Sequence, residues 1–333
     1  MRAQRLRADC GTPFVSGIRV IALSGGVGGA KLLRGLYHVL PPDTLAAIVN
    51  TGDDFEHLGL HISPDIDTAL YTLAGLAHPE QGWGRRDETW NFMRALETVG
   101  GETWFRLGDA DLALHVERTR RLGSGESLSA IIGDFARRFG IRAEIIPMSD
   151  DPVATRVLAD EGELAFQDYF VRRRCEPVLR GLRFAGAEGA RLPQSARAAF
   201  VSPELEAIII APSNPWLSID PLLAIPELRR ALETAKCCRI AVTPIIAGNA
   251  VKGPTAKIMA ELGIPVSPLA VAEHYRGLID GLVLDERDAA LADRFDIKVH
   301  IADTLMTTLD DYERVARMTL ALCRPIAADR KRR

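Results

Sequence analysis

The chain has 333 residues, and its 41 basic and 44 acidic residues give a formal net charge of -3. This balance provides no broad positive surface for nucleic acid or for an anionic membrane, so we expect small-molecule partners. The sequence has no apolar run of the about 18 residues that a membrane span needs. Its five cysteines show no metal-ligand spacing, so we expect a cytoplasmic protein without a zinc site.

Short apolar runs alternate with amphipathic segments along most of the chain. These runs are residues 18–23, 45–50, 207–211, 239–243, 281–285 and 299–302. Such alternation predicts an α/β protein with a mainly parallel sheet that helices cover on both faces. Ligands of these sheets bind beyond the carboxyl ends of the strands, so the residues that follow each run are the first candidates for a site.

A different pattern occupies the middle of the chain. Residues 88–97, 110–121 and 127–139 have helical periodicity, which predicts a small helical subdomain. The last of these segments carries an apolar stripe that we interpret as core, formed by Leu128, Ile131, Ile132, Phe135 and Phe139. Beyond it, residues 153–158 and 164–171 predict an antiparallel hairpin, because the second arm alternates and Gly162 can supply the turn.

These patterns divide the chain into a Rossmann-like core and smaller parts. We predict a core of residues 18–82 and 141–325 that includes the hairpin at 153–171, a helical subdomain at 83–140, a flexible extension at 1–17 and a basic tail at 326–333.

The first apolar run leads directly into a glycine-rich turn. Gly25, Gly26, Gly28 and Gly29 lie between this run and an amphipathic segment, with Lys31 two residues later. Glycines at a strand-to-helix turn let backbone N–H groups approach an anion, and the helix adds its positive dipole end, so the turn predicts a phosphate site. The spacing fits neither the dinucleotide fingerprint nor the P-loop. The alternative is a turn that only tightens the packing of helix on strand.

Two pairs of aspartates follow the second apolar run. Asp53 and Asp54 come directly after it, and Asp65 and Asp67 precede the next apolar segment. Residues two apart in an extended chain project to the same side, and carboxylate oxygens suit Mg²⁺ that substrate phosphates also hold. The alternative roles are structural, since such residues also cap helices and close turns.

Two further segments have the character of exposed sites. Trp83, Arg85, Arg86 and Trp90 combine flat rings that can stack on a heteroaromatic ligand with guanidinium groups that can neutralise phosphate, although buried tryptophans and solvated arginines are commoner. Residues 212–215 place Ser213 and Asn214 between two prolines. The amide of Asn214 offers a donor and an acceptor to a base or a phosphate. No histidine is assigned a catalytic role.

Several of these motifs together resemble one protein family along nearly the whole chain, from residue 19 to about residue 288. The matching segments include Ser24-Gly-Gly-Val-Gly-Gly-Ala-Lys31, Asn50-Thr-Gly-Asp-Asp54, Ser63-Pro-Asp-Ile-Asp-Thr68, Gly82-Trp-Gly-Arg-Arg-Asp-Glu-Thr-Trp90, Phe166-Gln-Asp-Tyr-Phe-Val171 and Ala211-Pro-Ser-Asn-Pro215. In these segments the sequence resembles the CofD family, the 2-phospho-L-lactate transferases of coenzyme F-420 biosynthesis.

The resemblance implies a three-layer Rossmann-like fold and usually a homodimer. It implies transfer of a phospho-C3-acid unit, phosphoenolpyruvate or 2-phospho-L-lactate, from its guanosine diphosphate-activated form to the deazaflavin alcohol Fo, with release of GMP and dependence on Mg²⁺. The glycine turn ends in Gly-Ala-Lys, which resembles bacterial members and favours phosphoenolpyruvate. Lactate, enolpyruvate and glycerate differ too little for the sequence to decide among them.

The resemblance also implies roles for single residues. Asp53 and Asp67 are expected to bind the metal with Asp65 close by, the glycine turn and Asn214 to contact guanosine diphosphate, and residues 82–90 to form part of the deazaflavin side. In the expected reaction Asp65 or Asp54 accepts the proton of the attacking hydroxyl, and the sequence does not choose between them. We expect Asp67→Ala to keep the fold and to lower turnover by orders of magnitude.

Two other functions compete with this interpretation. Nucleotide-sugar-binding regulatory proteins share the glycine hinge and the first aspartate pair without transferase activity, but they resemble this chain only at its start. A nicotinamide- or flavin-dependent oxidoreductase is disfavoured because the glycine spacing does not fit.

Overall fold

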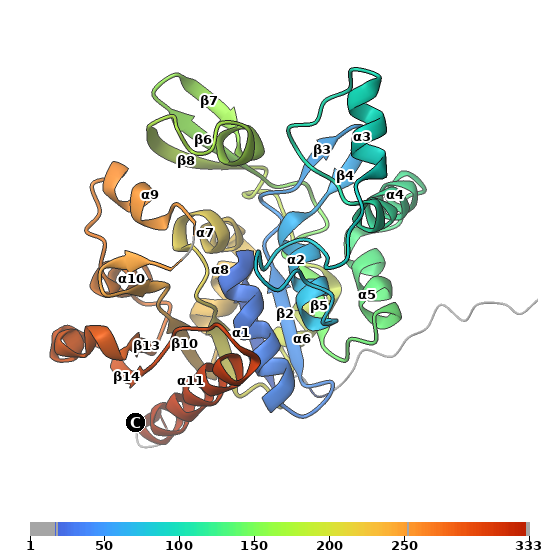
Figure 1. Cartoon of the computed structure of the whole chain (residues 1–333). Coiled ribbons are helices and arrows are strands. Elements are labelled where there is room, and N and C mark those ends of the chain that lie inside the picture. The colour runs from blue at the N-terminus through green and yellow to red at the C-terminus, as the bar shows by residue number, and fades with distance from the viewer. Residues whose placement is uncertain (1–16, 18, 252, 331–333) are drawn as a thin grey trace, which may run out of the picture.

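The computed structural model describes residue 17, residues 19–251 and residues 253–330, with side chains up to residue 326. Its centre is a seven-stranded parallel sheet in the order β14-β13-β10-β9-β1-β2-β5 (Figure 1). The strands are β1 (Val20–Ser24), β2 (Leu45–Val49), β5 (Glu144–Pro147), β9 (Ala207–Ile210), β10 (Cys238–Val242), β13 (Gly281–Asp285) and β14 (Lys298–Ala302). The predicted parallel sheet is confirmed, and β5 is the strand that the apolar runs did not predict.

The order of the strands reverses beside β1. The chain moves outward from β1 through β2 to β5, returns to the other side of β1 with β9, and continues outward through β10, β13 and β14. In open parallel sheets the crevice at such a reversal, outside the carboxyl ends of the strands, is where ligands bind. The loops that follow β1 and β9 therefore border the expected binding position.

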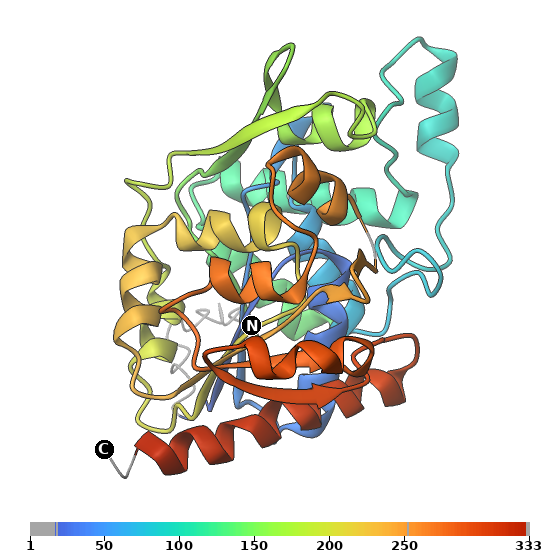
Figure 2. The same ribbon diagram turned by 90° about the vertical axis from the view of Figure 1, so that its left-hand side faces the viewer.

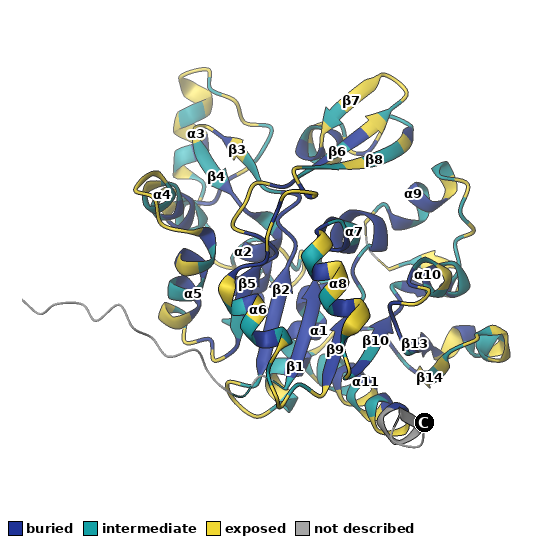
Figure 3. Cartoon of the chain, turned by 180° about the vertical axis from the view of Figure 1, so that it is seen from behind, coloured by how far each residue is buried: buried dark blue, intermediate teal, exposed yellow. Residues whose placement is uncertain are grey.

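Helices cover both faces because alternate residues of each buried strand face opposite sides. In β1, Val20 and Ala22 join the core under α1, α2 and α11, while Ile21 and Leu23 join the core under α6, α8 and α10. Figure 1 shows α1 and α11 in front of the sheet, and the reverse view in Figure 3 shows α6 and α8 in front of it. These helices are α1 (Gly26–Val39), α2 (Pro64–Leu73), α6 (Gln194–Phe200), α8 (Pro226–Thr234), α10 (Pro268–His274) and α11 (Leu309–Arg330).

The helical segment has the predicted three helices, and a small sheet that was not predicted precedes it in the chain. The helices are α3 (Asn91–Thr98), α4 (Asp109–Gly123) and α5 (Leu128–Arg138), and the sheet pairs β3 (Phe55–His57) with β4 (Leu60–Ile62). The apolar stripe of α5 is core as expected: four members are buried and Phe139 packs against the same cluster.

The predicted hairpin is the core of a three-stranded antiparallel sheet. Strand β6 (Ala154–Ala159) pairs with β7 (Gly162–Ala165) on one side and with β8 (Leu179–Ala185) on the other. The prediction was wrong about the second arm, which ends at Ala165 and continues into the helical turn η1 (Asp168–Arg172). The rings of Phe166 and Phe170 stack with centroids 5.2 Å apart, and this contact between residues four apart stabilises a helical turn.

Two small units stand above the carboxyl edge of the sheet. Figure 1 places the β6–β8 sheet on one side of this edge and α3 with the β3–β4 pair on the other, and the side view in Figure 2 shows the β6–β8 unit and α3 at the same end of the molecule. The further elements are η2 (Pro215–Ile219), α7 (Asp220–Leu223), β11 (Ile245–Ile246), β12 (Asn249–Ala250), α9 (Thr255–Glu261) and η3 (Glu286–Arg294).

The expected terminal segments are residues 1–17 and 326–333. Residues 1–16 of the predicted extension lie outside the described residues. At the other end, α11 runs to Arg330, so the predicted basic tail starts within a helix. No helix in the described part of the chain is both long and apolar enough to cross a membrane.

Candidate functional site

The loops after β1 and β9 are joined by a reciprocal pair of hydrogen bonds. The backbone N–H of Gly25 donates to Ser213 Oγ at 3.1 Å, and the Ser213 hydroxyl donates to the Gly25 carbonyl at 2.7 Å. Ser213 is buried. The structure thus brings together the glycine turn and Ser213, which the sequence analysis proposed as parts of one site. The two hydrogen bonds of Ser213 hold the turn in place.

Close packing accounts for three of the four glycines. A Cβ atom would lie 2.6 Å from Asp65 Oδ2 at Gly25, 2.5 Å from the Pro212 carbonyl oxygen at Gly28, and 2.3 Å from Ser24 Oγ at Gly29. Gly26 differs, because its φ of +63° lies in the left-handed region that glycine adopts without strain. The packing interpretation of the turn is therefore supported for Gly25, Gly28 and Gly29, and it coexists with any role in binding.

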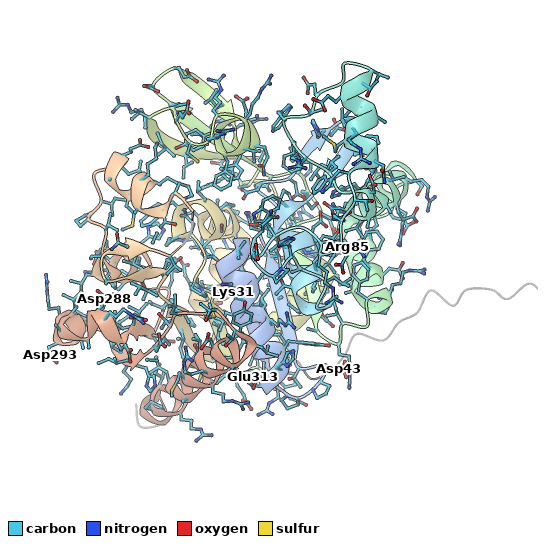
Figure 4. All side chains as sticks on the ribbon, in the orientation of Figure 1. Lys31, Asp43, Arg85, Asp288, Asp293 and Glu313 are labelled. Atoms are coloured by element: carbon cyan, nitrogen blue, oxygen red, sulfur yellow. The ribbon has the colours of Figure 1, made fainter. Side chains whose placement is uncertain are left out.

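Lys31 lies apart from the turn. Its Nζ donates to the Met306 carbonyl at 2.6 Å and lies 5.6 Å from the centre of the Tyr312 ring. Figure 4 shows Lys31 on α1. In this structure its ammonium group faces the segment that leads into α11, and a phosphate contact would require another rotamer.

Asn214 has one satisfied and one unsatisfied end. Its Oδ1 accepts hydrogen bonds from the backbone N–H groups of Trp216 at 3.0 Å and Leu217 at 3.2 Å, which caps η2. Its Nδ2 is buried and has no hydrogen-bond partner in the described structure. A buried amide donor without a partner is costly, so this group is available to a ligand acceptor.

Three aspartates share a buried position beside the glycine turn. Asp53 and Asp54 lie between β2 and β3, and Asp65 lies in the first turn of α2. Asn50 holds this arrangement, since its Nδ2 donates to Asp65 Oδ2 at 3.0 Å and its Oδ1 accepts the N–H of Gly52 at 2.8 Å. The close approach of Asp65 Oδ2 to Gly25 places the acidic group directly against the turn.

Burial makes these carboxylates hard to ionise. The pKa of Asp53 is raised well above its ordinary value by burial and then by the charges of Asp65 and Asp54, which Asn50 and Thr155 oppose only partly. Burial also raises the pKa of Asp65 to about 6, against the lowering influence of Asn50. The pKa of Asp54 is raised by burial as well.

Two oxygens of this acidic group have no hydrogen-bond partner among the described residues. They are Asp53 Oδ1 and Asp54 Oδ1, both buried. The other oxygen of Asp54 accepts from Ser63 Oγ at 2.7 Å and lies 3.2 Å from His61 Nε2. A buried carboxylate oxygen without a hydrogen bond suits a divalent cation, which prefers oxygen ligands.

Asp67 does not join this group. Both of its oxygens accept hydrogen bonds from the guanidinium of Arg118, one of them at 3.2 Å, and Arg118 is completely buried. The neighbouring charge that acts most strongly on Asp53 is that of Asp65, whereas Asp67 is bound by Arg118. The physical reason is that Pro64 starts a helix, in which residues two apart are separated by about 200° around the axis.

A second buried polar network surrounds Asp67. His115 lies 3.6 Å from Asp67 through Nδ1 and 3.3 Å from Asp111 through Nε2, while the hydroxyl of Tyr71 donates to Asp111. The ligand atoms of Asp67, Asp111 and His115 lie within 4.8 Å of one another, a spacing that could hold a metal ion. The guanidinium of Arg118 already binds both oxygens of Asp67, so this network is balanced by an internal cation.

The expected deazaflavin residues lie on the loop between α2 and α3, where they have different neighbours. Trp83 is 53% exposed, and Arg86 faces Asp87 at 3.7 Å. Arg85 lies over the ring of Tyr71 at 5.6 Å, beside α2 (Figure 4). The guanidinium of Arg106 stacks on Trp90 at 4.1 Å.

The residues that contact the aspartates from distant parts of the chain were not identified from the sequence. Arg118 and His115 come from α4, and the spacing of His115 from Asp111 offered one local signal, because residues four apart share a helix face. Gln167 lies between β7 and η1, and its Nε2 donates to the Asp53 carbonyl at 3.1 Å. Such a contact across 114 positions of the chain leaves no pattern in a single sequence.

Comparisons with known proteins show the family and the fold of the chain. The family model described as 2-phospho-L-lactate transferase CofD matches residues 20–321. The chain is 38% identical to a phosphoenolpyruvate transferase of Streptomyces avermitilis, over 93% of this chain and 99% of that protein. It is also 38% identical to a 2-phospho-L-lactate transferase of Methanosarcina mazei, over 90% and 99% of the two chains. A crystal structure of a UPF0052-family protein from Bacillus halodurans has the same fold, with a TM-score of 0.61 and 15% identity over 91% of this chain and 99% of that chain.

Proposed function

The chain belongs to the CofD family, and from this premise we propose that it is a Mg²⁺-dependent transferase of coenzyme F-420 biosynthesis. It takes a phospho-C3-acid unit from its guanosine diphosphate-activated form, transfers it to the deazaflavin Fo and releases GMP. Relatives of equal identity carry the names of both donor types. The bacterial type of glycine turn favours phosphoenolpyruvate over 2-phospho-L-lactate.

One observation carries the proposal. The buried Asp53 and Asp65 and the nearly buried Asp54 lie together where the strand order reverses, and Asp65 lies against the glycine turn. Oδ1 of Asp53 and Oδ1 of Asp54 have no hydrogen-bond partner among the described residues. Three ionised carboxylates close together repel one another. A divalent cation such as Mg²⁺, bound together with a diphosphate, would offset this repulsion.

We assign the metal to Asp53 and Asp65. Asp67 is excluded from this assignment because Arg118 occupies both of its oxygens. When bound there, Mg²⁺ would neutralise the charge of the diphosphate and of the carboxylates. The Nδ2 of Asn214, buried and without a partner, is the protein donor that we assign to a diphosphate or guanine oxygen.

The transfer requires one bond to form and one to break at phosphorus. The hydroxyl oxygen of the ribityl chain of Fo attacks the phosphorus that carries the C3 acid, and the bond from that phosphorus to the GMP oxygen breaks. Asp54 is suited to accept the hydroxyl proton, because its pKa is raised and its Oδ1 is free while Ser63 fixes its Oδ2. No covalent intermediate with the protein is needed.

Other parts of the proposal rest on the family resemblance. They are a cytoplasmic homodimer, and a deazaflavin position near the loop that carries Trp83, Arg85, Arg86 and Trp90. The buried Nε of Arg85 has no hydrogen-bond partner in the described structure, which makes Arg85 the best supported of the four.

A reconstituted reaction tests the proposal. Purified protein is incubated with Fo, Mg²⁺, GTP and a guanylylating enzyme, and phosphoenolpyruvate, 2-phospho-L-lactate and 3-phosphoglycerate are offered in turn. We expect GMP release and an Fo product whose mass identifies the C3 acid. Asp53→Asn is expected to lower turnover on the order of 100-fold or more, as loss of one charge-stabilising group typically does.

A matched control is available on the far side of the molecule. Asp293 is exposed on η3 (Figure 4), and Asp293→Asn makes the same chemical change without touching the site. Normal turnover of Asp53→Asn would count against the metal assignment. Binding of a UDP-sugar with no Fo product in any arm would count against the transferase and would favour a regulatory nucleotide-sugar-binding protein.

A further inference from the structure

The β6–β8 unit holds the loop that carries Asp53. The N–H of Thr155 donates to the Gly52 carbonyl at 2.7 Å, and Nε2 of Gln167 donates to the Asp53 carbonyl at 3.1 Å. These two carbonyls flank the backbone of Asp53. Both donors belong to a unit outside the main sheet, and Gln167 is only 5% exposed.

The same loop is fixed from the other side by Asn50. Asn50 Oδ1 accepts the N–H of Gly52, so donors and acceptors from two units hold residues 52–53 between them. The packing is tight, because a Cβ atom at Gly52 would lie 2.7 Å from Thr155 Oγ1 and 3.0 Å from Asn50 Oδ1. These contacts to the backbone therefore fix the position of Asp53 and the direction of its Cα–Cβ bond, from which the carboxylate extends.

We propose that Gln167 is a positioning residue for metal binding, which acts on the Asp53 carboxylate through its backbone carbonyl. This inference rests on the proposed function, since it takes Asp53 as a metal ligand. Groups that orient a ligand without touching the metal typically change metal affinity 10–100-fold when they are removed. A side chain that donates to the ligand's own peptide group has this role because a metal site requires its carboxylates in one orientation.

The test is direct metal binding to the purified full-length protein, with Mn²⁺ as the probe and electron paramagnetic resonance as the readout. Gln167→Met keeps the length of the side chain and removes its amide. We expect an about tenfold weaker Mn²⁺ affinity, and a similar increase in the Mg²⁺ concentration for half-maximal turnover. Turnover at saturating Mg²⁺ should fall far less, because added metal restores occupancy.

Two matched variants make the result interpretable. Arg183→Met places the same residue on β8 of the same unit, where Arg183 forms an exposed pair with Glu163 at 2.6 Å, and it should leave Mn²⁺ affinity unchanged. Asp53→Asn should abolish the tight Mn²⁺ site. Guanosine diphosphate affinity in EDTA is measured for each variant, and we expect the value for Gln167→Met to match the wild type.

Each outcome separates the two claims. Unchanged Mn²⁺ affinity in Gln167→Met, with loss in Asp53→Asn, would overturn the role of Gln167 and leave the metal assignment intact. Equal affinity in all variants, Asp53→Asn included, would overturn both. If Gln167→Met and Arg183→Met weaken Mn²⁺ binding equally, the unit acts only through its overall stability, which also rejects the specific role.

Discussion

Replacing Asp65 by asparagine should stabilise the metal-free protein at neutral pH. Burial raises the pKa of Asp65 from 3.8 to about 6. A raised pKa means that the folded state binds the proton more tightly than the unfolded state, so this stability is fully present below about pH 4 and is lost as the pH rises through about 6. The difference of about 2 units at 1.36 kcal/mol each makes ionised Asp65 cost about 3 kcal/mol at pH 8.

The assay compares urea unfolding of wild type and Asp65→Asn in EDTA at pH 4.5, 6 and 8. Other carboxylates change the stability of both proteins with pH, and the difference between the two isolates Asp65. We expect the variant to gain about 2 kcal/mol relative to wild type between pH 4.5 and pH 8, because about 1 kcal/mol of the cost is already present at pH 4.5. The substitution puts an NH₂ group in place of one carboxylate oxygen. If this group meets Nδ2 of Asn50, the hydrogen bond between the two side chains is lost, which lowers the stability of the variant by about 1 kcal/mol at every pH.

Mg²⁺ should stabilise wild type but not the Asp65→Asn variant. A cation that binds only the folded state stabilises it, so Mg²⁺ should raise the stability of wild type at pH 8 and do little for the variant. A pH-independent difference between the two proteins would refute the reasoning about burial. Equal stabilisation of both by Mg²⁺ would refute the place of Asp65 in the metal site.

Two further substitutions test the framework around the site. Arg118→Met should destabilise the protein by about 3–5 kcal/mol in urea unfolding, because it leaves Asp67 buried without its cation, and a loss below about 1 kcal/mol would contradict the buried pair. Gly29→Ala should lower stability by about 1–3 kcal/mol, since its Cβ would lie 2.3 Å from Ser24 Oγ. Gly123→Ala on α4, where no atom lies within 4 Å of a Cβ, is the matched control and should be neutral or stabilising.

The pairing of Asp67 with Arg118 also changes an expectation from the sequence. Asp67→Ala was expected to keep the fold and to impair only catalysis. This substitution would leave the fully buried guanidinium of Arg118 without its carboxylate partner, so loss of stability should accompany any loss of turnover. Unfolding measurements are therefore needed before a kinetic effect of this variant is interpreted.

The sequence predicted the central sheet well because its strands are buried on both faces. Strands β1, β2 and β9 are buried at every position, so each is an unbroken apolar run. Strand β5 escaped prediction because it has four residues, starts with the half-buried Glu144 and ends with a proline at the edge of the sheet. The turn from β7 into η1 depends on the contact of Phe166 with Phe170, which the alternating pattern did not reveal.

The acidic residues were located by their order in the chain, but their partners were not. Asp53 and Asp65 follow strands or start helices, so their place at the carboxyl edge follows from topology. Whether Asp65 or Asp67 faces Asp53 depends on where α2 begins, and Arg118 enters from α4, 51 residues away. Periodicity describes local backbone and contains no information on such contacts.

The first turn of α2 serves two environments at once. Asp65 faces the glycine turn and Asn50, whereas Asp67, on another side of the same turn, is bound by Arg118 of the helical subdomain. Arg118 also donates to the His61 carbonyl at 3.3 Å, and His61 in turn lies against Asp54. One network of contacts therefore joins α4 to the acidic group. A substitution in α4 that moves Arg118 is expected to change the positions of the carboxylates as well.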